Sequence, residues 1–191
     1  MIKFQKILTL SNLLSFLRLL ISIPVYFLFE KLQQGTGYRI ILLSLLLFAT
    51  ATDFFDGYFA RKFNQITEFG KLIDPLADKI IIAVIMVRLF SLELIPGYYF
   101  YLVIGRDILI LTGGIIISNK LGKVLSSNLL GKITVTFIGF YIIGIVLNLE
   151  NNLYWLHNLL LYSSLTLIFT SMLGYIVRAK ELLTWNKNES V

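Results

Sequence analysis

The sequence has no cysteine, three prolines and a single histidine in 191 residues, and only 15% of its residues are charged. The missing cysteine excludes disulfide bonds and thiolate metal ligands. The lone histidine, His157, excludes a metal centre built from several imidazoles. Any metal ion in this protein must therefore be bound by oxygen atoms, which favours Mg²⁺ or Mn²⁺ over zinc.

Hydrophobic residues, by contrast, are abundant: they make up 57% of the chain, and the mean hydropathy is +0.81. A soluble domain is about half apolar and about a quarter charged, so this composition indicates an integral membrane protein. The formal net charge of +6 would suggest nucleic acid as the partner of a soluble protein. In a membrane protein it indicates basic cytoplasmic loops instead, so we expect membrane lipid and no nucleic acid as a partner.

Six apolar runs are each long enough, at about 1.5 Å per residue, to cross about 30 Å of hydrocarbon as a helix. Residues 1–10 alternate basic and apolar side chains, which predicts a short helix on the membrane surface. A signal peptide is the alternative, and Asn12 and Arg18 inside the first run argue against it. We predict an all-α bundle of six transmembrane helices, with one domain over 1–183 and a polar tail over 184–191. The runs cover approximately residues 12–31, 38–62, 74–93, 98–118, 128–149 and 153–178.

Basic residues are distributed unequally between the two sides of this bundle. One side has only Lys31 and Arg39. Because cytoplasmic loops carry an excess of lysine and arginine, we expect the basic side in the cytoplasm, with both termini and the connection between the second and third runs. The protein would then lie in the cytoplasmic (inner) membrane. The basic side carries Lys3, Lys6, Arg61, Lys62, Lys71, Lys120, Lys123, Lys132, Arg178, Lys180 and Lys187.

Aromatic residues gather near the opposite face. Tyr98, Tyr99 and Tyr101 open the fourth run, and Tyr154 and Trp155 open the sixth. This placement predicts a belt of aromatic side chains at the membrane–water interface. We expect His157, in the same region, to be a surface residue.

Four of the eleven acidic residues stand in two pairs, in the stretch DFFDGYFARKFNQITEFGKLIDPLAD. Asp53 and Asp56 are spaced i, i+3, and Asp74 and Asp78 are spaced i, i+4, so each pair lies on one helix face. Four carboxylates gathered beside lipid repel one another and lose hydration unless a cation lies between them. Divalent metal ions are the natural cations for such a site.

The connection between the two pairs is short, so the second and third helices should be antiparallel neighbours with all four carboxylates at one end. Such an arrangement can bind two metal ions that neutralise phosphate charge. Gly57 and Ala60 leave room for a ligand to approach, and Arg61 supplies a cation suited to phosphate. The alternative is structural: aspartates that cap helix ends and small residues that pack helices together.

The complete pattern, Asp53-x2-Asp56-Gly57-x2-Ala60-Arg61-x8-Gly70-x3-Asp74-x3-Asp78, resembles the signature of the CDP-alcohol phosphotransferase family at every position. The resemblance implies six transmembrane helices, a homodimer, and transfer of a substituted phosphate from a CDP-linked donor to an alcohol with release of CMP. It implies that Asp53, Asp56, Asp74 and Asp78 bind two Mg²⁺ or Mn²⁺ ions, and that Asp78 is also the catalytic base. It further implies that the CDP group is contacted by Gly57, Ala60, Arg61 and Thr67.

A second motif lies in the first apolar run. Asn12, Ser15 and Arg18 are spaced i, i+3 and i+6, on one side of a helix. The pattern resembles the Asn-x2-Thr-x2-Arg of the family's phosphatidyltransferases, with Ser15 in place of threonine. The resemblance implies that these residues bind CDP-diacylglycerol. Helix capping together with a snorkelling arginine is the alternative.

The fourth run contains two charged residues, Arg106 and Asp107. An ionisable residue inside a membrane span is a functional candidate by default. We predict that Arg106 binds a phosphate of the acceptor, with pairing to another span as the alternative. The same acceptor pocket would include Lys120, Lys123, Lys132 and Arg178, although the positive-inside rule explains each of these equally well.

Two resemblances suggest different acceptors. The DPLADK stretch and the first-run motif resemble the phosphatidylglycerophosphate synthase branch, whose acceptor is sn-glycerol 3-phosphate. ELIP followed by GRDILI, over residues 93–96 and 105–110, resembles the cardiolipin synthases, whose acceptor is phosphatidylglycerol. We place glycerol 3-phosphate ahead, with inositol phosphate and serine still open.

Two other classes of membrane protein also use intramembrane carboxylates. An intramembrane prenyltransferase binds a diphosphate through aspartate-rich motifs but does not need Gly57, Ala60 and Arg61. A cation transporter places its ion ligands near mid-membrane, often in broken helices, whereas these aspartates cluster at one face.

Overall fold

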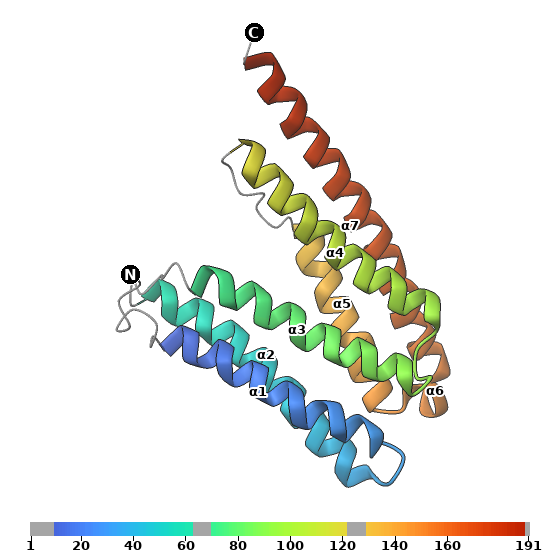
Figure 1. Cartoon of the computed structure of the whole chain (residues 1–191). Helices are drawn as coiled ribbons and strands as arrows, with labels where there is room; N and C mark the ends of the chain where they lie inside the picture. The colour runs from blue at the N-terminus through green and yellow to red at the C-terminus, as the bar shows by residue number, and fades with distance from the viewer. Residues whose placement is uncertain (1–9, 63–69, 122–128, 190–191) are drawn as a thin grey trace. The chain divides into compact units, whose positions relative to one another are not determined.

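The computed structural model describes residues 10–62, 70–121 and 129–189, with side chains described at 13–53, 79–117 and 129–181. The described elements are all helical, which confirms the all-α prediction. The surface helix predicted for residues 1–10 falls outside the described residues, except that Leu10 begins the first helix. The helices, labelled in Figure 1, are α1 (Leu10–Glu30), α2 (Thr36–Lys62), α3 (Gly70–Ser91), α4 (Gly97–Leu121), α5 (Leu129–Val146), α6 (Leu149–Asn152) and α7 (Tyr154–Glu189).

Five of these helices are long and apolar enough to cross a membrane within the part of the chain whose side chains are described. Helix α3 is 22 residues long and corresponds to the third predicted run. Its described side chains begin only at Lys79, so they cover too short a stretch for the same assessment. The six-span bundle therefore stays a prediction. The five segments are Leu13–Glu30, Thr36–Asp53, Gly97–Ile117, Leu129–Val146 and Tyr154–Glu181.

Helix α7 is longer than the sixth apolar run. It continues past residue 178 to Glu189, through most of the stretch predicted as a polar tail. The residues that follow Arg178 are Ala179, Lys180, Glu181, Leu182 and Leu183, all good helix formers. No glycine or proline interrupts them. The end of the apolar run therefore does not mark the end of the helix.

The contacts within the chain divide it into two compact units, Met1–Ile95 and Pro96–Val191. In the first unit, α1 packs along both α2 and α3 (Figure 1). The buried side chains of α1 recur at intervals of three or four residues, as one face of a helix requires. Three of them are polar, and none of these lies beyond Ser22: Ser15, Arg18, Ile21, Ser22, Val25 and Phe29.

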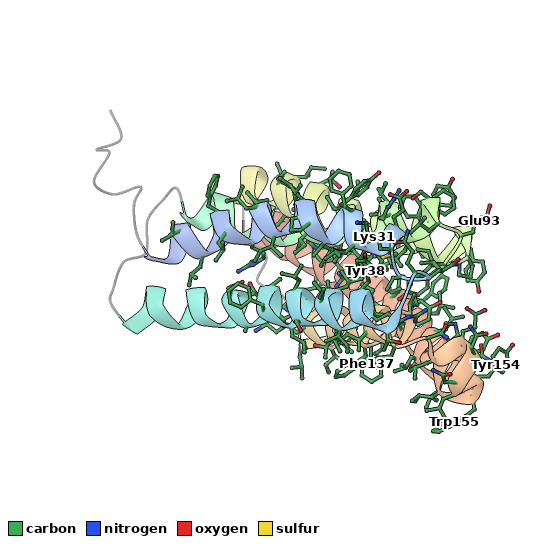
Figure 2. The ribbon with its side chains drawn as sticks, turned by 90° about the horizontal axis from the view of Figure 1, so that it is seen from below. Lys31, Tyr38, Glu93, Phe137, Tyr154 and Trp155 are labelled. Atoms are coloured by element: carbon green, nitrogen blue, oxygen red, sulfur yellow. The ribbon has the colours of Figure 1, made fainter. Side chains whose placement is uncertain are left out.

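An ion pair joins the last residue of α1 to α3. Arg88 Nη2 lies 2.6 Å from Glu30 Oε2, and its guanidinium lies 4.5 Å from the centre of the Tyr26 ring. At the adjoining turn, Lys31 Nζ lies 5.4 Å from the centre of the Tyr38 ring, and Figure 2 labels both residues. Arg88 had no role assigned from the sequence, and in the structure it joins α3 to α1 through Glu30 and Tyr26.

Helix α3 ends in a Schellman motif. The N–H of Glu93 donates to Phe90 O at 3.0 Å, and the N–H of Leu94 donates to Leu89 O at 2.9 Å. Glu93 occupies the left-handed position of this motif with φ 57°, where glycine is usual. Pro96 follows, and α4 begins at Gly97. These bonds satisfy the last carbonyls of α3 at the boundary between the two units.

In the second unit, α7 packs along α4 and α5 (Figure 1). Polar side chains join it to both helices. Tyr99 on α4 donates a hydrogen bond to Ser164 Oγ at 3.1 Å, and the Thr134 hydroxyl on α5 lies 3.1 Å from Leu167 O. Small and polar residues at helix interfaces are typical of membrane bundles. The buried stripe of α7 has the corresponding spacing: His157, Leu161, Ser164, Ile168 and Ser171.

Two residues assigned to the surface are instead buried. His157 is buried against Tyr141, with ring centroids 5.3 Å apart, and Tyr141 in turn contacts the fully buried ring of Tyr99 at 4.8 Å. The surface prediction was therefore wrong for His157, and the membrane-interface prediction was wrong for Tyr99. Both occupy the buried stripe of their helix, which the position along the chain did not reveal. Tyr154 and Trp155 are exposed, and they point outward from the start of α7 in Figure 2.

Helices α4 and α7 approach closely at Gly113. A Cβ atom at this position would lie 2.9 Å from Tyr175 Cε1, and the Tyr175 hydroxyl donates to Ile110 O at 3.0 Å. Gly105, on the same helix, has nothing within 4 Å of the corresponding position. The two glycines thus form a matched pair, one in a tight contact and one in open space.

We expect Gly113→Ala to be less stable than Gly105→Ala by about 1–3 kcal/mol, the usual cost of overpacking. Both substitutions change helix propensity equally, so the difference isolates the contact with Tyr175. Unfolding of both purified variants in the same detergent measures it. Equal stabilities would show that the Tyr175 ring moves aside without cost.

Candidate active site

Both aspartate pairs lie within helices. Asp53 and Asp56 belong to the last turns of α2, and Asp74 and Asp78 belong to the first turns of α3. The helical backbone therefore gives each pair the one-face spacing that the sequence predicted. Among the predicted site residues, those whose side chains lie outside the described part are Asn12, Asp56, Gly57, Ala60, Arg61, Thr67, Asp74, Asp78, Lys120 and Lys123.

Asp53 is the predicted metal ligand whose side chain is described. Its carboxylate forms an ion pair with Arg18 of α1, with Nη1 and Oδ1 3.0 Å apart. The two partners differ sharply in environment, since the Arg18 side chain is 2% exposed and that of Asp53 is 53% exposed. A buried arginine from one helix therefore reaches a half-exposed carboxylate on the next.

This pairing is the feature that the sequence analysis missed. Arg18 and Ser15 were predicted to bind the donor, and both are buried on the face of α1 that also contains Ser22. A buried arginine needs a counterion. The spacing of Ser15, Arg18 and Ser22 was visible in the sequence, but nothing in it showed which carboxylate lay opposite.

Arg106 is also buried, in the second unit. It is 3% exposed, its Nη1 lies 2.7 Å from Asp107 Oδ1, and its Nη2 donates to Gly131 O of α5 at 3.2 Å. The guanidinium thus pairs with its own neighbour and reaches across to α5. Adjacent helix residues rarely face each other, so this pairing was not expected from the spacing.

The other basic residues predicted for the acceptor pocket are arranged differently. Lys132 directly follows Gly131, and its side chain is exposed, as is that of Arg178 on α7. These exposed lysine and arginine side chains agree equally well with anion binding and with a basic membrane surface. The structure therefore distinguishes the buried, paired Arg106 from the exposed cations Lys132 and Arg178.

The donor atoms of this chain suit a hard divalent cation. The Asp53 carboxylate is half exposed, and a carboxylate has two oxygens of which Arg18 Nη1 approaches one. No group of three histidine, cysteine, aspartate or glutamate side chains occurs in the part of the chain where side chains are described, which leaves out the other three aspartates. Carboxylate oxygens are the ligands that Mg²⁺ and Mn²⁺ prefer.

Five helices long enough to cross a membrane define a multi-pass membrane protein, with one aspartate pair in the last turns of α2 and the other in the first turns of α3. The profile of the CDP-alcohol phosphatidyltransferase family matches residues 8–176, which is most of the chain. The protein belongs to this family and is therefore a transferase. The family resemblance drawn from the aspartate pattern is confirmed.

Several relatives carry the name CDP-diacylglycerol–glycerol-3-phosphate 3-phosphatidyltransferase. The one from Aquifex aeolicus is 36% identical over 179 residues, covering 90% of this chain and 96% of its own. The Bacillus subtilis protein is 39% identical over 89 residues, or 47% of this chain and 46% of its own. The Pseudomonas fluorescens protein is 42% identical over 80 residues, or 42% of this chain and 40% of its own. The last two alignments thus span less than half of each relative.

Proposed function

We propose that this protein transfers the phosphatidyl group of CDP-diacylglycerol to sn-glycerol 3-phosphate, forming phosphatidylglycerophosphate and releasing CMP. The observation that carries the proposal is the similarity to the Aquifex aeolicus protein, which covers 90% of this chain and whose name gives both substrates. The other two relatives carry the same name. These names favour glycerol 3-phosphate over phosphatidylglycerol as the acceptor, and they do not favour a prenyltransferase or a transporter.

The family generally depends on a divalent metal, and we propose Mg²⁺ or Mn²⁺ bound by Asp53, Asp56, Asp74 and Asp78. Helix register supports this grouping. Asp53 and Asp56 continue the 3–4 spacing of the buried residues Leu42, Leu46 and Ala49 on α2, and Asp74 and Asp78 precede Ile81 and Ile85 on α3 at the same spacing. Bound ions would neutralise the charge of the pyrophosphate and polarise the phosphorus that is attacked.

The protein side chains then have separate tasks. Asp78 takes the proton of the acceptor hydroxyl as that oxygen attacks phosphorus, and CMP leaves. Gly57, Ala60, Arg61 and Thr67 contact the CDP group, together with the donor motif Asn12, Ser15 and Arg18. Phosphate recognition in the acceptor pocket is assigned to Arg106, Lys120, Lys123, Lys132 and Arg178.

The membrane arrangement is part of the proposal. We propose six spans, with α3 as the third, and both termini and the aspartates on the cytoplasmic side. A water-soluble acceptor such as glycerol 3-phosphate would reach the site from the cytoplasm, while the lipid donor stays in the bilayer. A homodimer is proposed from the family resemblance alone.

An acceptor panel tests the function directly. Purified protein in detergent, given radiolabelled CDP-diacylglycerol, should form product with glycerol 3-phosphate at least about tenfold faster than with phosphatidylglycerol, inositol phosphate or serine, because a site built to bind one polar acceptor rejects others. EDTA should abolish the product, and Mg²⁺ or Mn²⁺ should restore it. Faster reaction with phosphatidylglycerol would instead identify a cardiolipin synthase.

A further inference from the structure

We propose that Arg18 is a positioning residue for Asp53, which holds that carboxylate in the orientation in which it binds a divalent cation. This inference rests on the proposed function, because it takes Asp53 as a metal ligand. It adds a role that the donor-binding motif does not include. The carrying observation is the 3.0 Å ion pair between Arg18 Nη1 and Asp53 Oδ1, formed between helices α1 and α2.

The burial of the two side chains supports a positioning role. An aspartate as exposed as Asp53 normally samples several side-chain orientations, whereas Arg18 is enclosed in the α1 interface beside Ser15 and Ser22. The planar guanidinium is already ordered by that burial, so forming the ion pair costs Arg18 little additional entropy. The rigid partner therefore determines the orientation of the mobile one.

Arg18 could also oppose metal binding, since it is a second cation beside the site. Charge repulsion between Arg18 and the metal ion depends on solvent, whereas the orientation of Asp53 by Arg18 does not. Because Asp53 is half exposed, charge repulsion between Arg18 and a metal ion is screened by water. Orientation is not screened, and removal of a residue that orients a metal ligand typically costs about 10–100-fold in metal affinity. We therefore expect loss of Arg18 to weaken metal binding.

The test is Mn²⁺ binding to the full-length protein in detergent, without any substrate, followed by the electron paramagnetic resonance of free Mn²⁺. Arg18→Met, which retains an apolar stem, should raise the Kd for Mn²⁺ by about 10–100-fold. Arg18→Lys keeps a cation and should recover part of the loss. Arg88→Met is the matched control, because Arg88 also joins two helices of this unit through an ion pair but contacts Glu30. Its Mn²⁺ affinity should equal that of the unsubstituted protein.

The same titration in an Asp53→Asn background shows whether Arg18 acts through Asp53. There, Arg18→Met should change the Kd by less than about twofold, since contacting residues are coupled and the carboxylate is already gone. This comparison stays informative if Arg18→Met alone folds poorly, because the double variant no longer contains an unbalanced carboxylate at position 53.

The possible failures are distinguishable. If the unsubstituted protein binds Mn²⁺ and Arg18→Met binds it equally well or more tightly, the positioning role is refuted and the proposed function stands. If Asp53→Asn leaves Mn²⁺ binding unchanged, Asp53 is not a ligand, and both the positioning role and that part of the proposed function fail. A donor-binding role alone would raise the KM for CDP-diacylglycerol in Arg18→Met without changing Mn²⁺ affinity.

Discussion

Asp78→Asn should lower the kcat for CMP release by about 10²–10⁴-fold, the usual contribution of a general base. Asparagine has nearly the same shape as aspartate but cannot accept the hydroxyl proton. Mn²⁺ binding should be weakened less, because Asp53, Asp56 and Asp74 would still supply carboxylate ligands. Radiolabelled CDP-diacylglycerol with saturating glycerol 3-phosphate and Mn²⁺ measures the turnover, and a substrate-free titration measures the metal affinity.

Glu150→Gln is the matched control for this loss of one carboxylate. Glu150 is exposed on the four-residue helix α6, so its substitution should leave kcat unchanged. Turnover of Asp78→Asn within about tenfold of the unsubstituted protein would remove Asp78 from the base role. Loss of both turnover and Mn²⁺ binding would instead assign Asp78 to metal ligation alone.

The helices were the most predictable part of this protein. Apolar runs of membrane-spanning length predicted six segments, and helices α1 to α5 begin and end within about four residues of the predicted bounds, the usual uncertainty of such boundaries. The reason is physical: backbone groups in lipid must be hydrogen-bonded within the segment, so long apolar runs have few alternatives to a helix. The end of α7 was missed because Ala179 to Leu183 favour a helix without being uniformly apolar.

Tertiary neighbours were much less predictable than helices. Arg18, Arg88 and Arg106 are all arginines within apolar runs, and each is paired with a carboxylate: Asp53, Glu30 and Asp107 respectively. Which carboxylate each arginine reaches depends on helix rotation and crossing, which the hydrophobic pattern specifies only coarsely. The burial of Tyr99 and His157 was missed for the same reason. Motif spacing thus predicted which residues form the candidate site, but not which partners the buried arginines would have.

Breaking the ion pair of Arg106 and Asp107 should cause a large loss of stability. The Arg106 side chain is 3% exposed and that of Asp107 is 12% exposed. Removing one member of a buried pair leaves an uncompensated charge, which costs about 3–5 kcal/mol. We therefore expect Asp107→Leu to destabilise the protein by about that amount. Unfolding by SDS titration from mixed micelles, followed by far-ultraviolet circular dichroism, measures it.

Replacing both members together should restore most of the lost stability, because apolar side chains of similar volume often replace a buried ion pair at little cost. The variant carrying Arg106→Met and Asp107→Leu should therefore be more stable than Asp107→Leu alone. The pair of Arg88 and Glu30 provides the comparison, since its carboxylate is 62% exposed and its coupling energy should be below about 1 kcal/mol. Equal coupling energies in the two pairs would show that burial does not determine the strength of these ion pairs.

The double variant also separates the structural role of Arg106 from acceptor binding. If Arg106 binds the phosphate of glycerol 3-phosphate, a folded double variant should raise the KM for that acceptor by about tenfold or more, the effect of losing a charged hydrogen bond. The KM for CDP-diacylglycerol should not change. An unchanged acceptor KM in a stable double variant would show that Arg106 serves only to join α4 to α5 through Gly131, and that the acceptor is bound by the exposed lysines and arginines instead.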